Sequence, residues 1–313
     1  MRTTRPPAAT DTRPPAGIGA VAVLCAAALW GTVGPAQVLA SSAANPGALG
    51  VARLLVGGLA LAAFRPSIDA WRRCLRHDVI GWVLLAAAGT GVYQVTFMHA
   101  VDQLGAALGT TIALGVAPVA TGLCALWWTR ERLTRGWVIG TIGAIGGCAV
   151  LLNPWTAASI SVAGITVALI SGTCYGVYTV AAKRFLQAGA PALPATAITL
   201  IIAGIVLSPL LALSPEHLAE FDSLLLIGWI GVLGTSLAYA AFVYGLHRTT
   251  APTAGTLSLA EPVLAAILGV LVLRENLTAS ALLGCGILIV GLVFVSVVDT
   301  RTQTRLATQR VPA

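Results

Sequence analysis

Long apolar stretches, separated by short polar segments, run through most of the chain. A bilayer core about 30 Å thick needs about 20 apolar residues per spanning helix, and stretches of roughly this length recur ten times. The predicted spans are 18–40, 47–64, 79–101, 104–128, 136–153, 160–182, 193–213, 223–245, 250–273 and 278–298. The pattern therefore predicts an all-α integral membrane protein with ten transmembrane helices.

The composition agrees with this interpretation. Hydrophobic residues make up 57% of the chain and charged residues only 9%, whereas soluble domains contain about 25% charged residues. The polar, proline-rich segment 1–17 is predicted to be disordered. The apolar run that follows it is too long for a signal peptide, so we expect a first spanning helix. The segment 299–313 is predicted to be a second polar tail.

The positions of the basic residues predict the orientation. If the N-terminus is cytoplasmic, 16 of the 18 basic residues lie in cytoplasmic segments, and Arg274 is the only one in an outer loop. Arg53 lies inside the second span, near its outer end. Cytoplasmic loops are enriched in Lys and Arg, so we expect a multi-pass protein of the cytoplasmic membrane with both termini inside. This distribution also explains the net charge of +7 without a nucleic-acid partner.

The chain contains an internal repeat. Shifting the sequence by 144 residues places Pro118 on Pro262 and Arg130-Glu131 on Arg274-Glu275, and a shift of 145 places Trp30-Gly31 on Tyr175-Gly176. The halves 18–153 and 160–298 each contain five predicted spans. Because five is odd, the second half must be inverted relative to the first. Inverted repeats are common in secondary transporters, with the substrate site near the bilayer midplane between the repeats.

The motifs of this repeat resemble those of the EamA-type drug/metabolite transporters. The resemblance is carried by the tryptophan-glycine pair of the first span and by the runs APVATGLCALWWTRERLT and AEPVLAAILGVLVLRENLT. It covers roughly residues 20–298. It implies ten helices in two inverted EamA repeats, and the export or import of small metabolites. The chain departs from repeat symmetry at Ala117, whose counterpart in the second half is Glu261.

Glu261 is the most informative polar residue. It falls about 11 residues into its span, or about 16 Å along the helix axis, close to the midplane. An acidic residue there costs about 3 kcal/mol to insert, so it must face protein or a wet cavity. Pro262 is expected to kink the helix and to free the carbonyl of Ser258. Glu261 and Ser258 would then form a substrate or proton site, or Glu261 would only fix the kink.

Polar and aromatic residues elsewhere near mid-membrane are the other candidate cavity residues. Trp30 and Gln37 are two helical turns apart, and Tyr175 and Tyr178 are three residues apart, so each pair shares a helix face. Such side chains suit a pocket for amphipathic solutes, although core packing is the alternative. The remaining candidates are Gln94 and Tyr239 as substrate ligands, His99 as a second coupling residue with Glu261, and Pro118 as a second kink.

Arg53 has two interpretations. Its position toward the outer end of a span favours a side chain that reaches the outer interface. A role in attracting anionic solutes is the alternative.

The motifs that the sequence lacks exclude several classes of function. The six cysteines form no CxxC pair or Cys/His cluster, so no metal site or cofactor is predicted. The sequence contains no phosphate-binding loop GxxxxGK[ST] and no hydrolase motif.

We therefore expect a secondary carrier, not an enzyme, that exports amino acids or related compounds by alternating access. The solute and the bilayer are its expected partners. Proton coupling is left open, as is the choice between a monomer and a homodimer. The alternatives are an intramembrane lipid-handling enzyme and a non-transporting scaffold.

Overall fold

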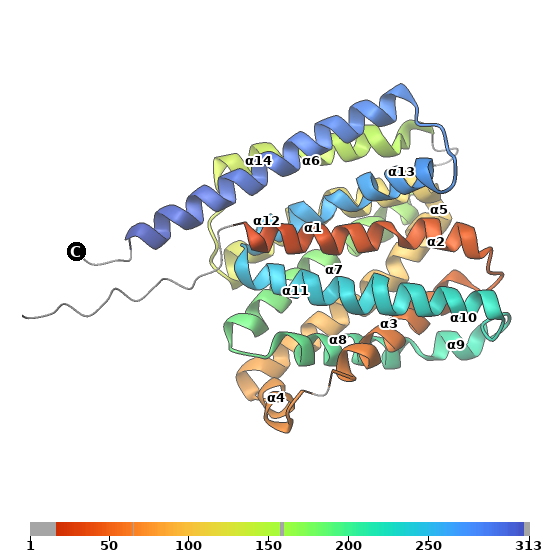
Figure 1. Cartoon of the computed structure of the whole chain (residues 1–313), viewed down its shortest axis with the longest axis horizontal. Coiled ribbons are helices and arrows are strands. Elements are labelled where there is room, and N and C mark those ends of the chain that lie inside the picture. Colours follow the sequence, from red (N-terminus) through yellow and green to blue (C-terminus); the bar gives the residue numbers. More distant parts are fainter. Residues whose placement is uncertain (1–16, 65, 157–159, 310–313) are drawn as a thin grey trace, which may run out of the picture.

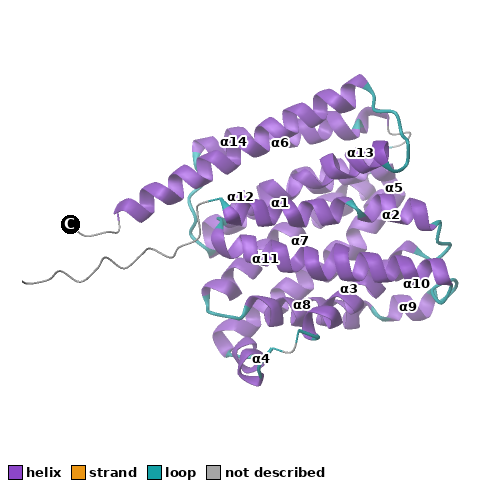
Figure 2. Cartoon of the chain, viewed as in Figure 1, coloured by secondary structure: helices purple, strands orange, loops and turns teal. Residues whose placement is uncertain are grey.

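The computed structural model describes residues 17–64, 66–156 and 160–309, and every regular element in these ranges is helical (Figures 1 and 2). The first half contains α1 (Ile18–Gly31), α2 (Val33–Ala40), α3 (Pro46–Ala62), α4 (Ile68–Cys74), α5 (His77–Trp128), α6 (Arg135–Leu152) and the short turn η1 (Pro154–Thr156). The second half contains α7 (Val162–Gln187), α8 (Ala192–Leu207), α9 (Pro209–Leu213), α10 (Phe221–Gly228), η2 (Trp229–Leu237), α11 (Ala238–Arg248), α12 (Ala251–Leu257), η3 (Ser258–Ala260), α13 (Glu261–Leu271) and α14 (Ala279–Gln309).

The helices cross the bundle ten times, as the apolar pattern predicted. Eight segments of the described chain are long and apolar enough to span a membrane, and α3 is a shorter apolar helix. One of the eight, α5, folds back on itself at Gly105, which has the positive φ of 78° that glycine tolerates. We call the end at which α1 begins the terminal end and the opposite end the distal end; they lie at the left and right of Figure 1.

The predicted span boundaries differ from the observed ones mainly at two helix ends. Helix α7 continues to Gln187 and α14 to Gln309, because neither extension contains a proline or glycine that would stop it. The segment 299–313, predicted as a tail, is therefore helical through Gln309. Of the predicted disordered segment 1–17, all but Gly17 lies outside the described residues.

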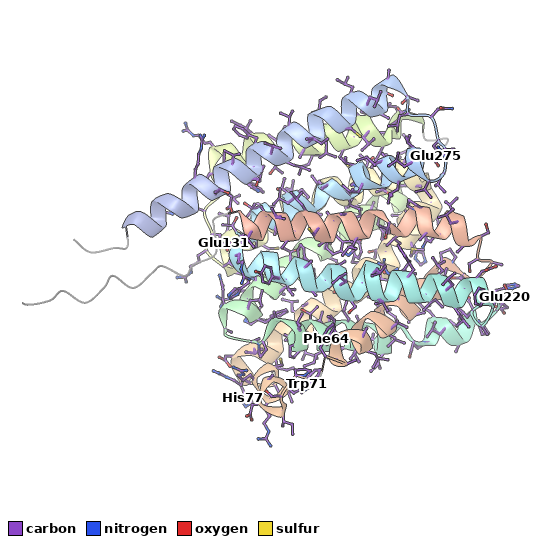
Figure 3. All side chains as sticks on the ribbon, in the orientation of Figure 1. Phe64, Trp71, His77, Glu131, Glu220 and Glu275 are labelled. Atoms are coloured by element: carbon purple, nitrogen blue, oxygen red, sulfur yellow. The ribbon has the colours of Figure 1, made fainter. Side chains whose placement is uncertain are left out.

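The two repeats match in backbone detail at their α5–α6 and α13–α14 corners. Arg130 and Arg274 both have left-handed backbones, with φ of 56° and 61°. The amides of the glutamates that follow them donate to equivalent carbonyls, Glu131 to Ala125 at 3.2 Å and Glu275 to Gly269 at 3.0 Å. These corners lie at opposite ends of the bundle (Figure 3), as an inverted repeat requires.

The threonines that follow these corners cap the next helices. Thr134 Oγ1 accepts from the amide of Trp137 at 3.1 Å, and Thr278 Oγ1 accepts from the amide of Ala281 at 3.1 Å. A side-chain acceptor at this position satisfies one of the free amides of the first helical turn. The same local chemistry therefore starts α6 and α14, which pack along each other at one edge of the bundle (Figure 1).

Two glycines allow the repeats to cross closely at their centre. A Cβ atom on Gly31 would lie 2.8 Å from the carbonyl oxygen of Glu261 and 2.8 Å from Leu264 Cβ. A Cβ atom on Gly176 would lie 2.7 Å from Ala120 Cβ and 2.7 Å from the amide nitrogen of Thr121. Leu264 and Ala120 are equivalent by the 144-residue shift. The glycine of each half therefore packs against the equivalent helix of the other half, Gly31 against α13 and Gly176 against α5.

Candidate substrate cavity

A cavity of about 580 Å³ lies between the two repeats. This volume is within the range of small-molecule sites. Its lining includes the end of α2 at Gln37, the start of α3 at Pro46 and the end of α6 at Leu152, which all lie at the distal end. The cavity therefore extends from the centre of the bundle toward the distal end.

Glu261 lines this cavity at the first residue of α13, near the middle of the Ala251–Leu271 span. No hydrogen bond or ion pair to its carboxylate is formed by any residue that the structure describes. Its backbone carbonyl packs closely against Gly31 of α1. The carboxylate is consequently available to a solute.

The backbone before Glu261 differs from the predicted kink. Residues Ser258–Ala260 form a 3-10 turn, and the Ser258 carbonyl accepts a hydrogen bond from the Glu261 amide. The prediction of a free carbonyl at Ser258 is therefore wrong, because the tighter turn supplies a donor three residues later. The Ser258 hydroxyl lines the cavity and donates to the carbonyl of Gly255 at 2.8 Å. Pro262 is the second residue of α13, in the first turn, where a missing amide is tolerated.

Arg53 is a cavity residue whose preferred sequence interpretation was wrong. Instead of reaching the outer interface, its side chain is half-buried in the cavity lining, and Nη2 donates to Gln94 Oε1 at 2.9 Å. The Gln94 amide nitrogen packs against Gly50, where a larger residue would collide with it.

Aromatic rings form the wall between these polar groups. Trp30 makes edge contacts with Tyr175 and Tyr239, at ring centroid distances of 6.4 and 5.5 Å. Tyr93, which the sequence interpretation missed, lies 5.9 Å from Tyr175. All four residues line the cavity, as does the predicted Gln37 near its distal mouth. The rings shape a narrow amphipathic chamber, because each tyrosine presents an apolar face and one polar atom.

Tyr178 and His99 do not line the cavity, and the kink predicted at Pro118 is not observed. Tyr178 is buried behind it, with its ring 5.5 Å from Tyr239 and 6.1 Å from Phe242. His99 is exposed, and its Nδ1 lies 2.9 Å from the Val95 carbonyl oxygen. Helix α5 remains helical through Pro118, and its only non-helical residue is Gly105.

A polar network lies at the terminal end of the bundle (Figure 3 labels Glu131 there). Lys183, on α7, donates to the carbonyl oxygens of Leu246 and Thr249 at 2.7 and 2.6 Å. Its Nζ lies 4.0 Å from Glu131 Oε1, and Glu131 Oε2 accepts from the amide of Ala251 at 2.8 Å. The network thus joins the α5–α6 corner of the first half to α7 and the α11–α12 corner of the second.

Burial governs the electrostatics of this network. It raises the pKa of the Glu131 carboxyl above its ordinary value, although the nearby Lys183 ammonium acts in the opposite direction. Nearby, Asp299 Oδ1 accepts hydrogen bonds from the hydroxyls of Thr250 and Thr253 at 3.2 and 3.1 Å. Glu131 of the first half and Asp299 of α14 therefore both contact the α11–α12 corner.

The EamA-like transporter family matches residues 17–153 and 162–297, which are most of the chain. The chain belongs to this family. Its two matches correspond to the two inverted five-helix repeats. As a member of the EamA-like transporter family it is a multi-pass membrane protein, and its relatives are transporters, not enzymes.

Two curated relatives and one solved structure illustrate the similarity of this EamA-like chain. The "Uncharacterized transporter YwfM" of Bacillus subtilis is 36% identical over 292 residues, covering 90% of this chain and 95% of the relative. The "Threonine/homoserine exporter RhtA" of Escherichia coli is 30% identical over 240 residues, covering 76% and 77%. A solved structure titled "Crystal structure of protein" matches with a TM-score of 0.78 at 21% identity, covering 91% and 98%. This last match concerns the fold alone.

Proposed function

We propose that the protein is a secondary carrier that exports small zwitterionic amino acids across the cytoplasmic membrane. The observation that carries the proposal is the pair of opposite charges in one cavity. Arg53 and Glu261 both line it, and within the described residues they form no ion pair with each other. A guanidinium suits a carboxylate and a carboxylate suits an ammonium, so an α-amino acid matches both ends. The name of the 30%-identical threonine/homoserine exporter agrees with this class.

The cavity and the network support transport by alternating access. The cavity reaches toward the distal end, while Lys183 and Glu131 join the two halves at the terminal end. In the orientation favoured by the basic residues, the terminal end is cytoplasmic and this conformation faces outward. Breaking the network while the distal end closes would expose the same site to the cytoplasm. The near-equal packing of inverted repeats makes two such states accessible.

Glu261 is the proposed coupling residue. A bare carboxylate near the midplane is costly, so it requires either a substrate ammonium or a proton. Binding and release then bias the two conformations differently, and only such differential binding can shift a conformational equilibrium. His99, the other predicted coupling residue, faces away from the cavity and has no part in this proposal.

The experiment is a counterflow assay with the full chain in proteoliposomes. Vesicles are loaded with unlabelled threonine, and the uptake of labelled threonine, homoserine, 1-amino-2-propanol and 3-hydroxybutyrate is compared. The last two compounds retain only the amine or only the carboxylate of threonine. We expect exchange of the amino acids and little exchange of either half-molecule, because each would leave one charged group of the cavity unpaired.

Two variants and two controls test the assignment. Arg53→Gln and Glu261→Gln each remove one charged contact, worth about 1.5 to 3 kcal/mol, and should weaken threonine binding by about tenfold or more. Arg73→Gln and Glu220→Gln remove the same charges at exposed positions and should leave exchange unchanged. If Glu261→Gln exchanges threonine normally from about pH 5.5 to 8, the glutamate only shapes the helix start. Exchange of 1-amino-2-propanol as fast as that of threonine would reject the zwitterion class.

A further inference from the structure

A second cavity, of about 430 Å³, lies at the terminal end, outside the transport pathway proposed above. Its lining comes from the first and last turns of α5, from the corner after α5 and from the last turns of α7. The lining residues share an amphipathic character; they are Trp82, Trp127, Trp128, Thr129, Arg130 and Arg184. None of them lines the central cavity.

Two arginines, Arg130 and Arg184, supply the charge of this pocket. No ion pair joins Arg130 or Arg184 to an acidic group among the residues that the structure describes. Arg184 Nε is buried and has no hydrogen-bond partner among the described residues. The Arg184 guanidinium instead covers the Trp82 ring, with Cζ 5.0 Å from the centroid. A buried donor without an acceptor costs free energy, and an anion placed in the pocket would remove that cost.

The residues next to these arginines in the chain have side chains that point into the bundle. Glu131 follows Arg130 in the chain and Lys183 precedes Arg184, and these two residues meet inside the bundle at 4.0 Å. The salt-bridged pair therefore faces the core, while the arginines border the pocket. Two positive charges, one from each repeat, therefore lie at the same end of the bundle without an ion-pair partner in the described part of the chain.

The tryptophans indicate what kind of anion fits. The Trp82 and Trp128 rings contact each other at 5.7 Å, and Trp127 is 81% exposed. Tryptophan concentrates where a membrane protein meets the lipid headgroups. A ligand held here would place a charged group against the arginines and apolar chains beside the indole rings. A lipid has both parts, whereas a soluble phosphate has only the first.

We propose that this pocket binds the phosphodiester headgroup of an anionic phospholipid, with Arg130 and Arg184 as ligands from the two repeats. Arginine presents a planar set of donors that matches phosphate oxygens, and basic pockets at the cytoplasmic side of transmembrane helices bind anionic headgroups. The bound lipid spans the α5–α6 corner and the end of α7, beside the Glu131–Lys183 contact. The assignment to the inner leaflet rests on the orientation proposed above, but the binding site itself does not.

Native mass spectrometry of the purified full chain tests this proposal. The protein is equilibrated in detergent with equimolar phosphatidylglycerol and phosphatidylcholine, and the retained lipids are counted. We expect phosphatidylglycerol to be preferred, and the preference to fall by about tenfold in Arg130→Gln/Arg184→Gln. The single variant Arg130→Gln alters only an exposed side chain and should lose part of the preference with the fold intact.

The matched control is Arg72→Gln/Arg73→Gln, which removes two charges from exposed positions on α4 at the same end. It should retain the preference. An equal loss in this control would mean that diffuse surface charge attracts the lipid and would overturn the proposal. Displacement of phosphatidylglycerol by millimolar inorganic phosphate would overturn it as well, because the site would then recognise the free anion. A wild-type chain without any preference would also reject it.

Discussion

Gly31→Ala is predicted to destabilise the protein although alanine favours a helix more than glycine does. The added methyl carbon would lie 2.8 Å from the Glu261 carbonyl oxygen, 2.8 Å from Leu264 Cβ and 3.1 Å from the Ala265 amide nitrogen. Two of these atoms are backbone and cannot rotate away, so α1 and α13 must separate by about 0.6 Å to move from 2.8 Å to the ordinary contact distance of 3.4 Å. Overpacking of this kind costs about 1 to 3 kcal/mol.

A matched glycine isolates that cost. Gly146 is exposed in the middle of α6, and nothing lies within 4 Å of the position of its missing Cβ. Gly146→Ala therefore gains the helix propensity term of about 1 kcal/mol without a collision. Because both variants gain this term, the difference between them is the overpacking cost alone, about 1 to 3 kcal/mol. Gly176→Ala, the repeat equivalent of Gly31→Ala, should lose a similar amount.

Thermal unfolding in detergent measures this difference through the cysteines. Cys74 and Cys148 are buried, so a thiol-reactive fluorescent dye reports their exposure as the fold is lost. Gly31→Ala and Gly176→Ala should melt below the wild type, and Gly146→Ala at or above it. If Gly31→Ala and Gly146→Ala melt at the same temperature, the crossing at Glu261 accepts the added methyl group without cost. The predicted overpacking would then be wrong.

Two further predictions concern the network at the terminal end. Lys183→Met removes the ammonium that donates to two carbonyls and leaves Glu131 without its cation. Breaking a buried pair in this way should lower the free energy of unfolding by about 3 to 5 kcal/mol, measured by the same melts; an unchanged melting temperature would contradict it. The second prediction is a pH effect: because burial raises the native pKa of Glu131, the folded state binds its proton more readily than the unfolded state. Stability should therefore rise as the pH falls from neutral toward the ordinary value of 4.5, and Glu131→Gln should lack this contribution; identical pH profiles would refute it.

The helices and the repeat could be predicted from the sequence because each has a one-dimensional signature. Apolar run length sets the spans, and the 144-residue shift predicts the matching corners at Arg130 and Arg274. The reversal at Gly105 was harder to predict, since a single residue separates the two arms of α5. The π-helical segment η2 had no signature at all. Within it, the Thr235 hydroxyl donates to the Ile230 carbonyl five residues earlier at 2.8 Å.

The cavity could be predicted only in part, because side-chain direction depends on packing between helices. In a membrane span the lipid face and the core face are both apolar, so periodicity does not say which way Arg53 points. Its position in the cavity is set by Gln94 on another helix. Tyr178 shares a helix face with Tyr175, but Tyr239 and Phe242 pack against it and separate it from the cavity. Such contacts join residues far apart in the sequence, which no local pattern records.

The asymmetry between Ala117 and Glu261 acquires a physical meaning once the two crossings are compared. Gly176 and Gly31 meet equivalent elements of the opposite half, so the packing at the centre is close to symmetric. The backbone conformation at the two positions is not symmetric. Helix α5 stays α-helical at Ala117, whose carbonyl accepts from the Thr121 hydroxyl at 2.7 Å. A 3-10 turn instead precedes Glu261. A symmetric frame gives two conformations of similar energy, and a ligand changes their ratio only through unequal contacts. A single carboxylate on one side of such a frame supplies that inequality, which two matched carboxylates would largely cancel.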